Sequence, residues 1–284
     1  MSAVGLIGLA LLGLVAGSFA TMGVHRLADP DIGLWRPGPR CPGCQASIAT
    51  RDLVPVVSFV TRRGRCRACG DRITWTYPLV EVLTAALFVV AGWRRPEVVE
   101  LIPVLVLVWT LVVASVTDLY IYLIPNRLTF PAIGASVLVM VPLALVDDPS
   151  RLGQAAVGLA LYFTLLFVPH LLYPAGMGMG DVKLSLLLGL HLGYLAPDMI
   201  TTVRMVVMAM LLGSLLGVLA GAILMISRRA GFDPLPDPLA AVDTDSPSGA
   251  IDTERGAASG FPFGPPLAVG CLWVVFFPAA LGLT

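Results

Sequence analysis

Apolar residues along the chain gather into eight long runs separated by short polar stretches. A helix of roughly 20 apolar residues crosses a bilayer core about 30 Å thick, and several of the runs reach that length. The pattern therefore predicts an all-α polytopic membrane protein with about eight transmembrane helices. The runs cover residues 3–24, 78–93, 101–117, 125–146, 154–173, 182–197, 200–226 and 262–283.

Composition supports this class, because 57% of the 284 residues are hydrophobic, more than in average soluble domains, and only 13% are charged. The exception is the segment 25–77, which holds nine Arg and four Asp and reads as a small soluble domain. We therefore expect a first transmembrane helix over 1–24, this domain over 25–77, and a seven-helix membrane domain over 78–284. Within the last, residues 230–260 are rich in Asp, Pro, Ser and Gly and predict a disordered linker.

Arginine distribution predicts the orientation, since cytoplasmic loops carry the excess of basic residues. The loop after the first run holds nine Arg, and the loop after the seventh opens with Arg228 and Arg229. Both loops are therefore expected in the cytoplasm, which places both termini outside. The same count puts Asp118, after the third run, and Asp181, at the start of the sixth, at the cytoplasmic edge.

Four of the five cysteines form two CxxC pairs, Cys41 with Cys44 and Cys66 with Cys69, separated by 21 residues. This spacing is typical of a structural zinc site in which four thiolates complete a tetrahedron. A segment of about fifty residues is usually too small to fold on a hydrophobic core alone and needs a cross-link such as a bound metal ion. The pattern predicts bound Zn²⁺ in a zinc-ribbon-like domain between the first two helices.

Disulfides and free thiols are the alternatives, and the reducing cytoplasm disfavours disulfides. Nucleic-acid binding is a second possible role for the ribbon, because Arg62, Arg63, Arg65 and Arg67 cluster there. Anchoring at anionic lipid headgroups explains these arginines more simply. We expect no nucleic-acid partner and leave the oligomeric state open.

Asp118 and Asp181 are the carboxylates that stand out, because each is an ionisable residue in a sequence that is otherwise apolar enough to insert into a bilayer. If the two carboxyls face each other, burial and like-charge repulsion favour one protonated and one ionised group near neutral pH. That is the division an aspartic protease requires, in which one carboxylate activates water and the other carboxyl polarises the scissile carbonyl. The alternative is simple pairing with Arg127 or Lys183 near the headgroups. Asp147, Asp148 and Asp198 are read as ordinary loop carboxylates.

The segment before Asp181 reads GMGMGDVKL and contains Gly176, Gly178 and Gly180. Glycine permits positive φ and close backbone approach, so we expect these residues to leave helical geometry and admit an extended substrate. Lys183, the only lysine, is expected to neutralise the charge of Asp181, to orient that carboxylate, or to extend its ammonium group to the membrane interface. Glu81, early in the second run, is a buried carboxylate that packing alone does not explain.

The chain resembles the bacterial type IV prepilin peptidases, the bifunctional leader peptidases and N-methyltransferases of the GxGD class of membrane aspartyl proteases. The motifs that carry the resemblance span nearly the whole chain: GSF with HRL, CPGC, IATRDLVPVVSF, RRGRCRACGDRI, YPLVEVLTAALF, TDLYIYLIPNRLT, GMGMGDVKL and FPFGPPLAVG.

The resemblance implies that Asp118 and Asp181 are the catalytic pair, with Gly178, Gly180 and Lys183 in the active-site loop. It also implies Zn²⁺ on the four cysteines. Substrates would be prepilins or pseudopilins whose leader is cut at the cytoplasmic face of the bacterial inner membrane. S-adenosylmethionine would then methylate the new N-terminus, with Glu81, Arg51 and Asp52 as methyl-transfer candidates.

Two departures from the family pattern stand out: Ala20-Thr21 replaces Leu-Asn after GSF, and Asn126 replaces Asp after Ile-Pro. Neither departure touches the proteolytic pair, and Thr21 lies in the half linked to methyl transfer. Two other functions use the same features. One is a carboxylate-dependent ion-coupled transporter, and the other is a non-catalytic scaffold for pilus or secretion assembly.

Overall fold

The computed structural model describes residues 1–28, 41, 44, 46–48, 54–230 and 261–283. The described residues contain helices and no β-strand, although Arg65 and Arg72 form an isolated antiparallel bridge. The chain divides into two compact units, Met1–Val113 and Ala114–Thr284. The predicted all-α class is confirmed, while the expected linker over 230–260 falls almost wholly outside the described residues.

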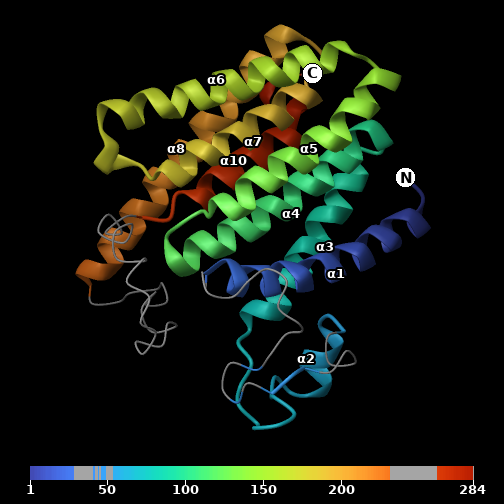
Figure 1. The fold of residues 1–284 in the computed structure, drawn as a ribbon, viewed down its shortest axis with the longest axis vertical. Helices are drawn as coiled ribbons and strands as arrows, with labels where there is room; N and C mark the ends of the chain where they lie inside the picture. The colour runs from blue at the N-terminus through green and yellow to red at the C-terminus, as the bar shows by residue number, and fades with distance from the viewer. Residues whose placement is uncertain (29–40, 42–43, 45, 49–53, 231–260, 284) are drawn as a thin grey trace. The chain divides into compact units, whose positions relative to one another are not determined.

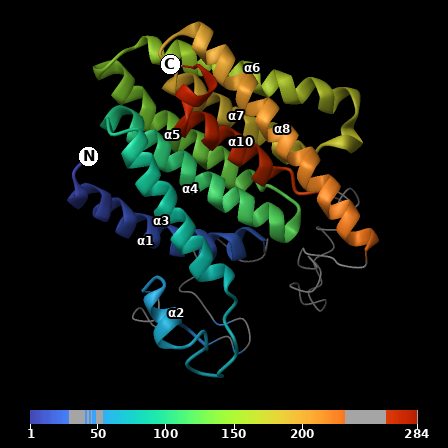
Figure 2. The same ribbon diagram turned by 180° about the vertical axis from the view of Figure 1, so that it is seen from behind.

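The first unit is built on the pair α1 (Ala3–Ala28) and α3 (Thr76–Arg94), which lie side by side in Figures 1 and 2. Two glycines of α1 allow this contact: a Cβ on Gly17 would lie 2.6 Å from the Cα of Glu81, and Gly13 meets α3 as closely one turn away. The short α2 (Val57–Thr61) belongs to the segment between these helices.

The second unit centres on α7, most of whose residues are buried. Helices α5, α6, α8 and α10 all contact it. The closest contact is with α6, where Gly158 faces Gly189 so tightly that a Cβ on either glycine would overlap the other's backbone. Small residues let helices in membranes approach in this way. The elements of this unit, after the end of α4 (Val98–Ile121), are α5 (Asn126–Val146), α6 (Ser150–Leu172), η2 (Pro174–Gly176), α7 (Met179–Leu195), α8 (Met199–Arg229), α10 (Gly264–Phe276) and η3 (Pro278–Leu281).

Each of the eight predicted apolar runs contains one helix. Six helices in the described part of the chain, α1, α3, α4, α5, α6 and α8, are long and apolar enough to cross a membrane. The other two are shorter, since α7 has 17 residues and α10 has 13. The largest difference in boundary is in the last run, where α10 ends at Phe276 and η3 follows. The difference that bears on the site is at α4, which continues past residue 117 to Ile121 and so includes Asp118 in its last turn.

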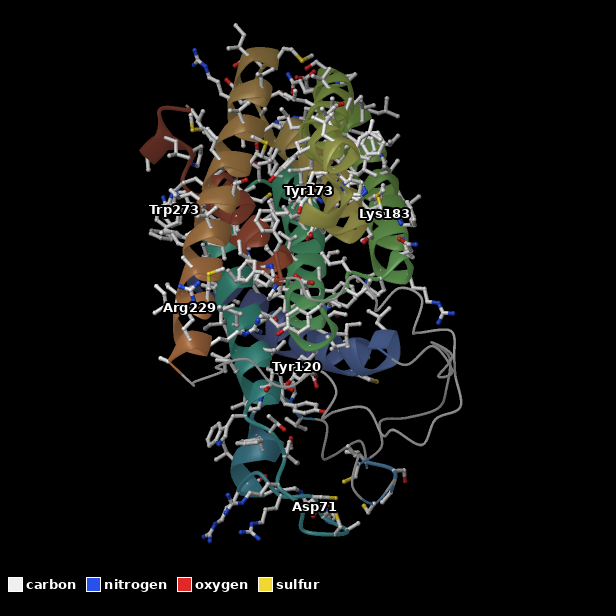
Figure 3. All side chains as sticks on the ribbon, turned by 90° about the vertical axis from the view of Figure 1, so that its left-hand side faces the viewer. Asp71, Tyr120, Tyr173, Lys183, Arg229 and Trp273 are labelled. Carbon is white, nitrogen blue, oxygen red and sulfur yellow. The ribbon has the colours of Figure 1, made fainter. Side chains whose placement is uncertain are left out.

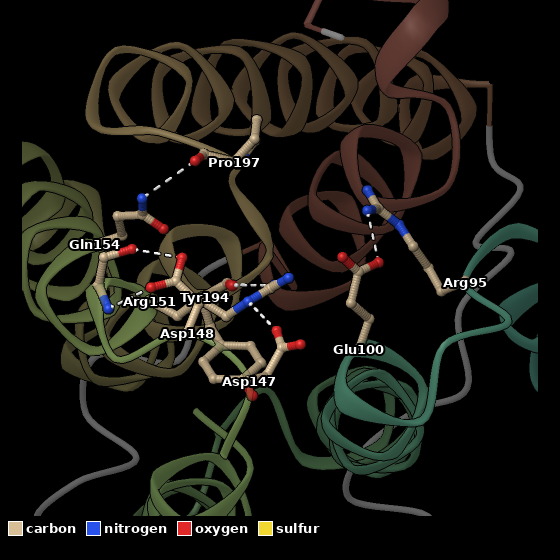
Figure 4. A network of polar contacts seen from close by, with 9 residues as sticks. Arg95, Glu100, Asp147, Asp148, Arg151, Gln154, Tyr194 and Pro197 are labelled. Atoms are coloured by element: carbon tan, nitrogen blue, oxygen red, sulfur yellow. Dashed lines mark hydrogen bonds and ion pairs between the residues drawn. The ribbon is translucent and has the colours of Figure 1, made fainter. Parts of the chain in front are cut away.

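The loop carboxylates have structural partners. Asp198 caps α8 by accepting from the N–H of Thr201 at 2.9 Å, and the hydroxyl and N–H of Thr201 hold the pKa of Asp198 below its ordinary value. Asp147 pairs with Arg151 at 3.0 Å, and Asp148 accepts from a serine two residues on, as Figure 4 shows. These contacts explain the three acids without assigning them a catalytic role.

Candidate active site and metal centre

Asp118 is buried at the end of α4, with 5% of its surface exposed. Its Oδ2 accepts a hydrogen bond from the N–H of Gly264, the first residue of α10, at 2.8 Å. The two residues are 146 positions apart in sequence, so this bond fastens the start of α10 to the end of α4. Sequence reasoning did not single out Gly264, and its only signal was its place in the FPFGPP motif.

Asp181 lies in the first turn of α7 and is 8% exposed. Its Oδ1 is buried and has no hydrogen-bond partner among the described residues. The Asp118 carboxyl is close enough to interact with it electrostatically. In the described part of the chain, no ion pair joins either aspartate to Arg127 or Lys183, which removes the simple pairing alternative there.

The glycines before Asp181 act through close approach. Gly178 is the N-cap of α7 with φ −66° and ψ 140°, so it leaves helical geometry as expected, whereas Gly180 is helical, and neither glycine has positive φ. A Cβ on Gly180 would lie 3.2 Å from the Cβ of Ile124 and 3.3 Å from its backbone. A Cβ on Gly178 would lie 3.4 Å from Oδ2 of Asp181. Gly180 therefore lets the start of α7 approach Ile124, whereas a side chain at position 178 would make only an ordinary contact with Asp181.

Two polar contacts hold the segments around this site. Lys183, labelled in Figure 3, donates from Nζ to Oδ1 of Asn126 at 2.9 Å and so ties the first turns of α7 and α5. His170, at the end of α6, contacts the carbonyl oxygen of Met177 through Nδ1 at 2.9 Å. This contact ties the end of α6 to the glycine segment.

The four cysteines come together in the first unit. Their sulfur atoms all lie within 4.8 Å of one another, and Sγ of Cys41 is 3.8 Å from Sγ of Cys69. A tetrahedron with Zn–S bonds of about 2.3 Å has edges of about 3.8 Å, so the four sulfurs fit a metal ion of this kind. Sulfur atoms gather beside Asp71 in Figure 3, where Cys69 contacts that carboxylate.

The thiols of the cluster differ electrostatically: desolvation and the side-chain contact with Asp71 raise the pKa of Cys69 to about 12, whereas the surroundings of Cys66 have the opposite effect. Backbone N–H groups of Cys69 and Ala68 lower the pKa of the Cys66 thiol to about 6. Because the thiolate is the metal-binding form, these N–H groups favour the state that a metal requires. The fifth cysteine, Cys271, is buried in α10 and takes no part in the cluster.

Glu81 connects the cysteine-containing segment to the helix pair. Its carboxylate accepts from the N–H of Val56 at 2.7 Å and from the hydroxyl of Ser18. Val56 has φ 57°, a conformation that β-branched residues rarely adopt. The contacts with Ser18 and Gly17 give the GSF motif a structural role that sequence reasoning missed. The other methyl-transfer candidates, Arg51 and Asp52, lie outside the described residues.

The residues that depart from the family pattern all lie in the described part of the structure, where their contacts can be stated. Ala20 is fully buried, and Thr21 donates from its hydroxyl to the carbonyl oxygen of Ser18 at 2.9 Å. Asn126 accepts from Lys183. Both substitutions therefore sit in satisfied local contacts.

Comparison with known proteins matches two family descriptions. The Bacterial Peptidase A24 N-terminal domain matches residues 11–95, which include the cysteine cluster. The Type IV leader peptidase family matches residues 105–225, which include both buried aspartates. No solved structure matches the chain.

Curated relatives agree with these matches, and each of the following is a prepilin leader peptidase/N-methyltransferase. The protein of Bacillus subtilis (strain 168) is 34% identical over 230 residues, covering 80% of this chain and 86% of the relative. That of Klebsiella pneumoniae is 35% identical over 192 residues, 66% of this chain and 84% of the relative. That of Pseudomonas putida is 32% identical over 241 residues, covering 77% of this chain and 81% of the relative. The chain therefore belongs to the type IV leader peptidase family.

Proposed function

We propose that this protein is an intramembrane aspartic endopeptidase that removes the leader of type IV prepilins or pseudopilins and then N-methylates the new N-terminus. The observation that carries the proposal is the meeting of two buried carboxyls, Asp118 and Asp181, from helices that are not consecutive. Family membership supports the same reaction, since the curated relatives carry the name prepilin leader peptidase/N-methyltransferase.

Peptide hydrolysis requires one group that takes a proton from water and another that polarises the scissile carbonyl. Two close carboxyls sharing one proton supply both groups. We assign these roles to Asp118 and Asp181 together. The burial of both excludes bulk water, which strengthens their effect on the charge that develops in the transition state.

The glycine segment is proposed to present the substrate. Gly178 carries no side chain beside Asp181, where a Cβ would lie 3.4 Å from Oδ2, and we assign it to the path of the peptide. Gly180 and Lys183 hold the first turn of α7 against Ile124 and Asn126. The leader would thus be read in extended form next to the two carboxyls.

Zn²⁺ is the metal that we assign to the cysteine cluster. Four sulfur ligands leave no coordination position for water, so the ion would be structural and take no step in hydrolysis. Cys41, Cys44, Cys66 and Cys69 would hold it. Its role would be to fold a segment too small to build a core of its own.

Methyl transfer is assigned to the half of the protein that contains this segment. Glu81 is the candidate with visible contacts, and we assign it the positioning of the strained backbone at Val56. Arg51 and Asp52 remain candidates from the sequence. S-adenosylmethionine is the methyl donor that the family resemblance implies.

The proposed location is the bacterial inner membrane, with the cysteine segment and both catalytic carboxyls facing the cytoplasm and both termini outside. The order of the helices supports placing both aspartates on one side. Asp118 ends α4 and Asp181 begins α7, and the two helices between them, α5 and α6, return the chain to the side from which it left. We retain the division into residues 1–24, 25–77 and 78–284 as the proposed domain organisation.

The test is co-expression of the full chain with a prepilin, followed by mass spectrometry of the pilin. The proposal expects removal of the leader and a mass increase of one methyl group at the new N-terminus. An uncut prepilin in the presence of folded, membrane-inserted protein would reject the peptidase. It would then favour the scaffold, or the transporter if ion flux depends on the same aspartates.

A further inference from the structure

The hydrogen bond from Gly264 distinguishes the two aspartates from each other. Gly264 is the first residue of α10, and the first N–H groups of a helix have no partner inside the helix. This one points at Oδ2 of Asp118 at 2.8 Å. A backbone donor at the positive end of a helix favours the ionised form of a carboxyl that it contacts.

Asp181 is in the opposite situation. It is as deeply buried as Asp118, but its Oδ1 has no hydrogen-bond partner among the described residues. Burying an ionised carboxylate without a partner is costly, and the neighbouring Asp118 adds repulsion of like charge. Both effects favour the protonated form of Asp181.

The other charged groups near the pair come from the starts of α7 and α5. Asp181 also lies near a helix N-terminus, that of α7, which favours its ionised form. None of the described residues donates a hydrogen bond to its Oδ1, however, and a direct hydrogen bond outweighs the diffuse field of a helix end for a buried charge. Lys183 on α7 directs its ammonium to Asn126 at the start of α5.

We propose that Gly264 is a positioning residue whose N–H keeps Asp118 ionised as the general base, so that the shared proton resides on Asp181, the general acid. This inference rests on the proposed peptidase function. It assigns a role to the start of α10 and gives each aspartate a separate task.

With this assignment, every proton that the two aspartates exchange during hydrolysis is accounted for. Asp118 takes a proton from water, the water oxygen bonds to the carbonyl carbon, and Asp181 gives its proton to the carbonyl oxygen, which forms a tetrahedral diol. Asp118 then gives its proton to the leaving nitrogen while Asp181 takes one back from a diol hydroxyl. The C–N bond breaks, a carboxylic acid and an amine leave, and both aspartates return to their starting states.

The geometry also explains why this position is glycine. A Cβ at residue 264 would lie 2.9 Å from Oδ2 of Asp118 and 3.1 Å from Cδ1 of Ile124. Oδ2 is the atom that accepts the hydrogen bond, so even an alanine must displace the carboxyl or the start of α10.

Infrared spectroscopy of the full-length protein, with carbon-13 in its aspartate carboxyls, tests the assignment without requiring activity. At neutral pH we expect a protonated-carboxyl band in the wild type and in Asp118→Asn, and its loss in Asp181→Asn. The proposal would be overturned if the band persisted in Asp181→Asn, if it disappeared in Asp118→Asn, or if the wild type lacked it. Because this result does not depend on cleavage, it separates failure of the assignment from failure of the peptidase function.

The pH dependence of prepilin cleavage tests the role of Gly264. In Gly264→Ala we expect cleavage to fall at least about tenfold at neutral pH and the acidic limb of the pH–rate profile to move to higher pH, because the ionised base loses its donor. The basic limb, set by Asp181, should stay in place. Gly134→Ala, on α5 with open space around the added carbon, is the matched control and should keep the wild-type profile. A shift of the basic limb alone, or no shift, would contradict the inference, and the infrared result decides the matter if Gly264→Ala does not fold.

Discussion

Lys183 and Asn126 join the first turns of α7 and α5 by a hydrogen bond of 2.9 Å from the ammonium to the amide oxygen. Lys183 is two residues after Asp181, and Asn126 is two residues after Ile124, against which Gly180 packs. The bond therefore spans the same helix junction that brings Asp181 into place. It replaces the carboxylate partner that the family pattern would supply.

Loss of this bond should weaken the junction moderately. We expect Lys183→Met to lower the free energy of unfolding by about 1 kcal/mol, because an exposed hydrogen bond to a charged group contributes little more than that. Asn126→Asp keeps an acceptor and should match or slightly exceed the wild type. Unfolding in detergent micelles measures both. Equal stability of Lys183→Met and the wild type would show that the contact holds nothing in place.

The catalytic pair should be essential. Asp118→Asn and Asp181→Asn each remove an acid or base, so we expect leader cleavage to fall by about 100-fold to 10,000-fold. Asp147→Asn is the control, because this loop carboxylate only pairs with Arg151. Mass spectrometry of a co-expressed prepilin measures cleavage. Normal processing by either folded catalytic variant would remove that residue from the mechanism.

The glycines of the α7 segment should differ in their sensitivity. Gly180→Ala brings a carbon to 3.2 Å from Ile124 and should reduce cleavage strongly while leaving membrane insertion intact. Gly178→Ala makes only an ordinary contact with Asp181, so we expect a smaller loss. Gly153→Ala, on α6 in open space, should keep full activity and gain up to about 1 kcal/mol of stability from helix propensity. Full activity of a Gly178→Ala, Gly180→Ala double variant would exclude the close-approach argument.

Metal content tests the cysteine cluster. We expect about one Zn²⁺ per chain in the purified protein and nearly none in Cys41→Ser or Cys66→Ser, because each removes one of four ligands. Cys271→Ala lies outside the cluster and should keep the metal. Elemental analysis by mass spectrometry gives the ratio. Protease sensitivity of the cysteine segment should rise with metal loss, and unchanged zinc in Cys41→Ser would reject the site.

Glu81 offers a test that separates charge from position. Glu81→Gln keeps an oxygen that can accept from Val56, whereas Glu81→Ala leaves that N–H without its acceptor. If Glu81 positions the segment, methylation should fall at least about tenfold in Glu81→Ala and be largely kept in Glu81→Gln. Equal loss in both variants would instead indicate that the charge is needed. Glu100→Gln, which weakens the pair with Arg95 and leaves the contact with Val56 untouched, is the control, and cleavage should persist in all three.

The sequence predicted the apolar helices well, because hydrophobic runs of this length have few alternatives to a helix in a bilayer. It also predicted the cysteine cluster, since CxxC turns bring sulfurs together whatever the rest of the fold does. The structural role of Gly264 could not be predicted, because it depends on a contact between residues 146 positions apart. The helical conformation of Gly180 was missed for a related reason. Glycine is used both for unusual backbone angles and for close packing, and only the position of Ile124 shows which applies.

The length of α7 bears on where water must enter the membrane. Its 17 residues extend about 25 Å, several Å less than a hydrocarbon core of about 30 Å. If Leu195 reaches the far interface, Asp181 is about 21 Å from it along the helix and lies about 9 Å beneath the near interface, so the bilayer thins there or water penetrates to meet it. Hydrolysis should then respond to lipid chain length, slowing in vesicles of longer-chain lipids and quickening in thinner ones. Membrane thickness would thus set the rate of a reaction whose chemistry is confined to two side chains.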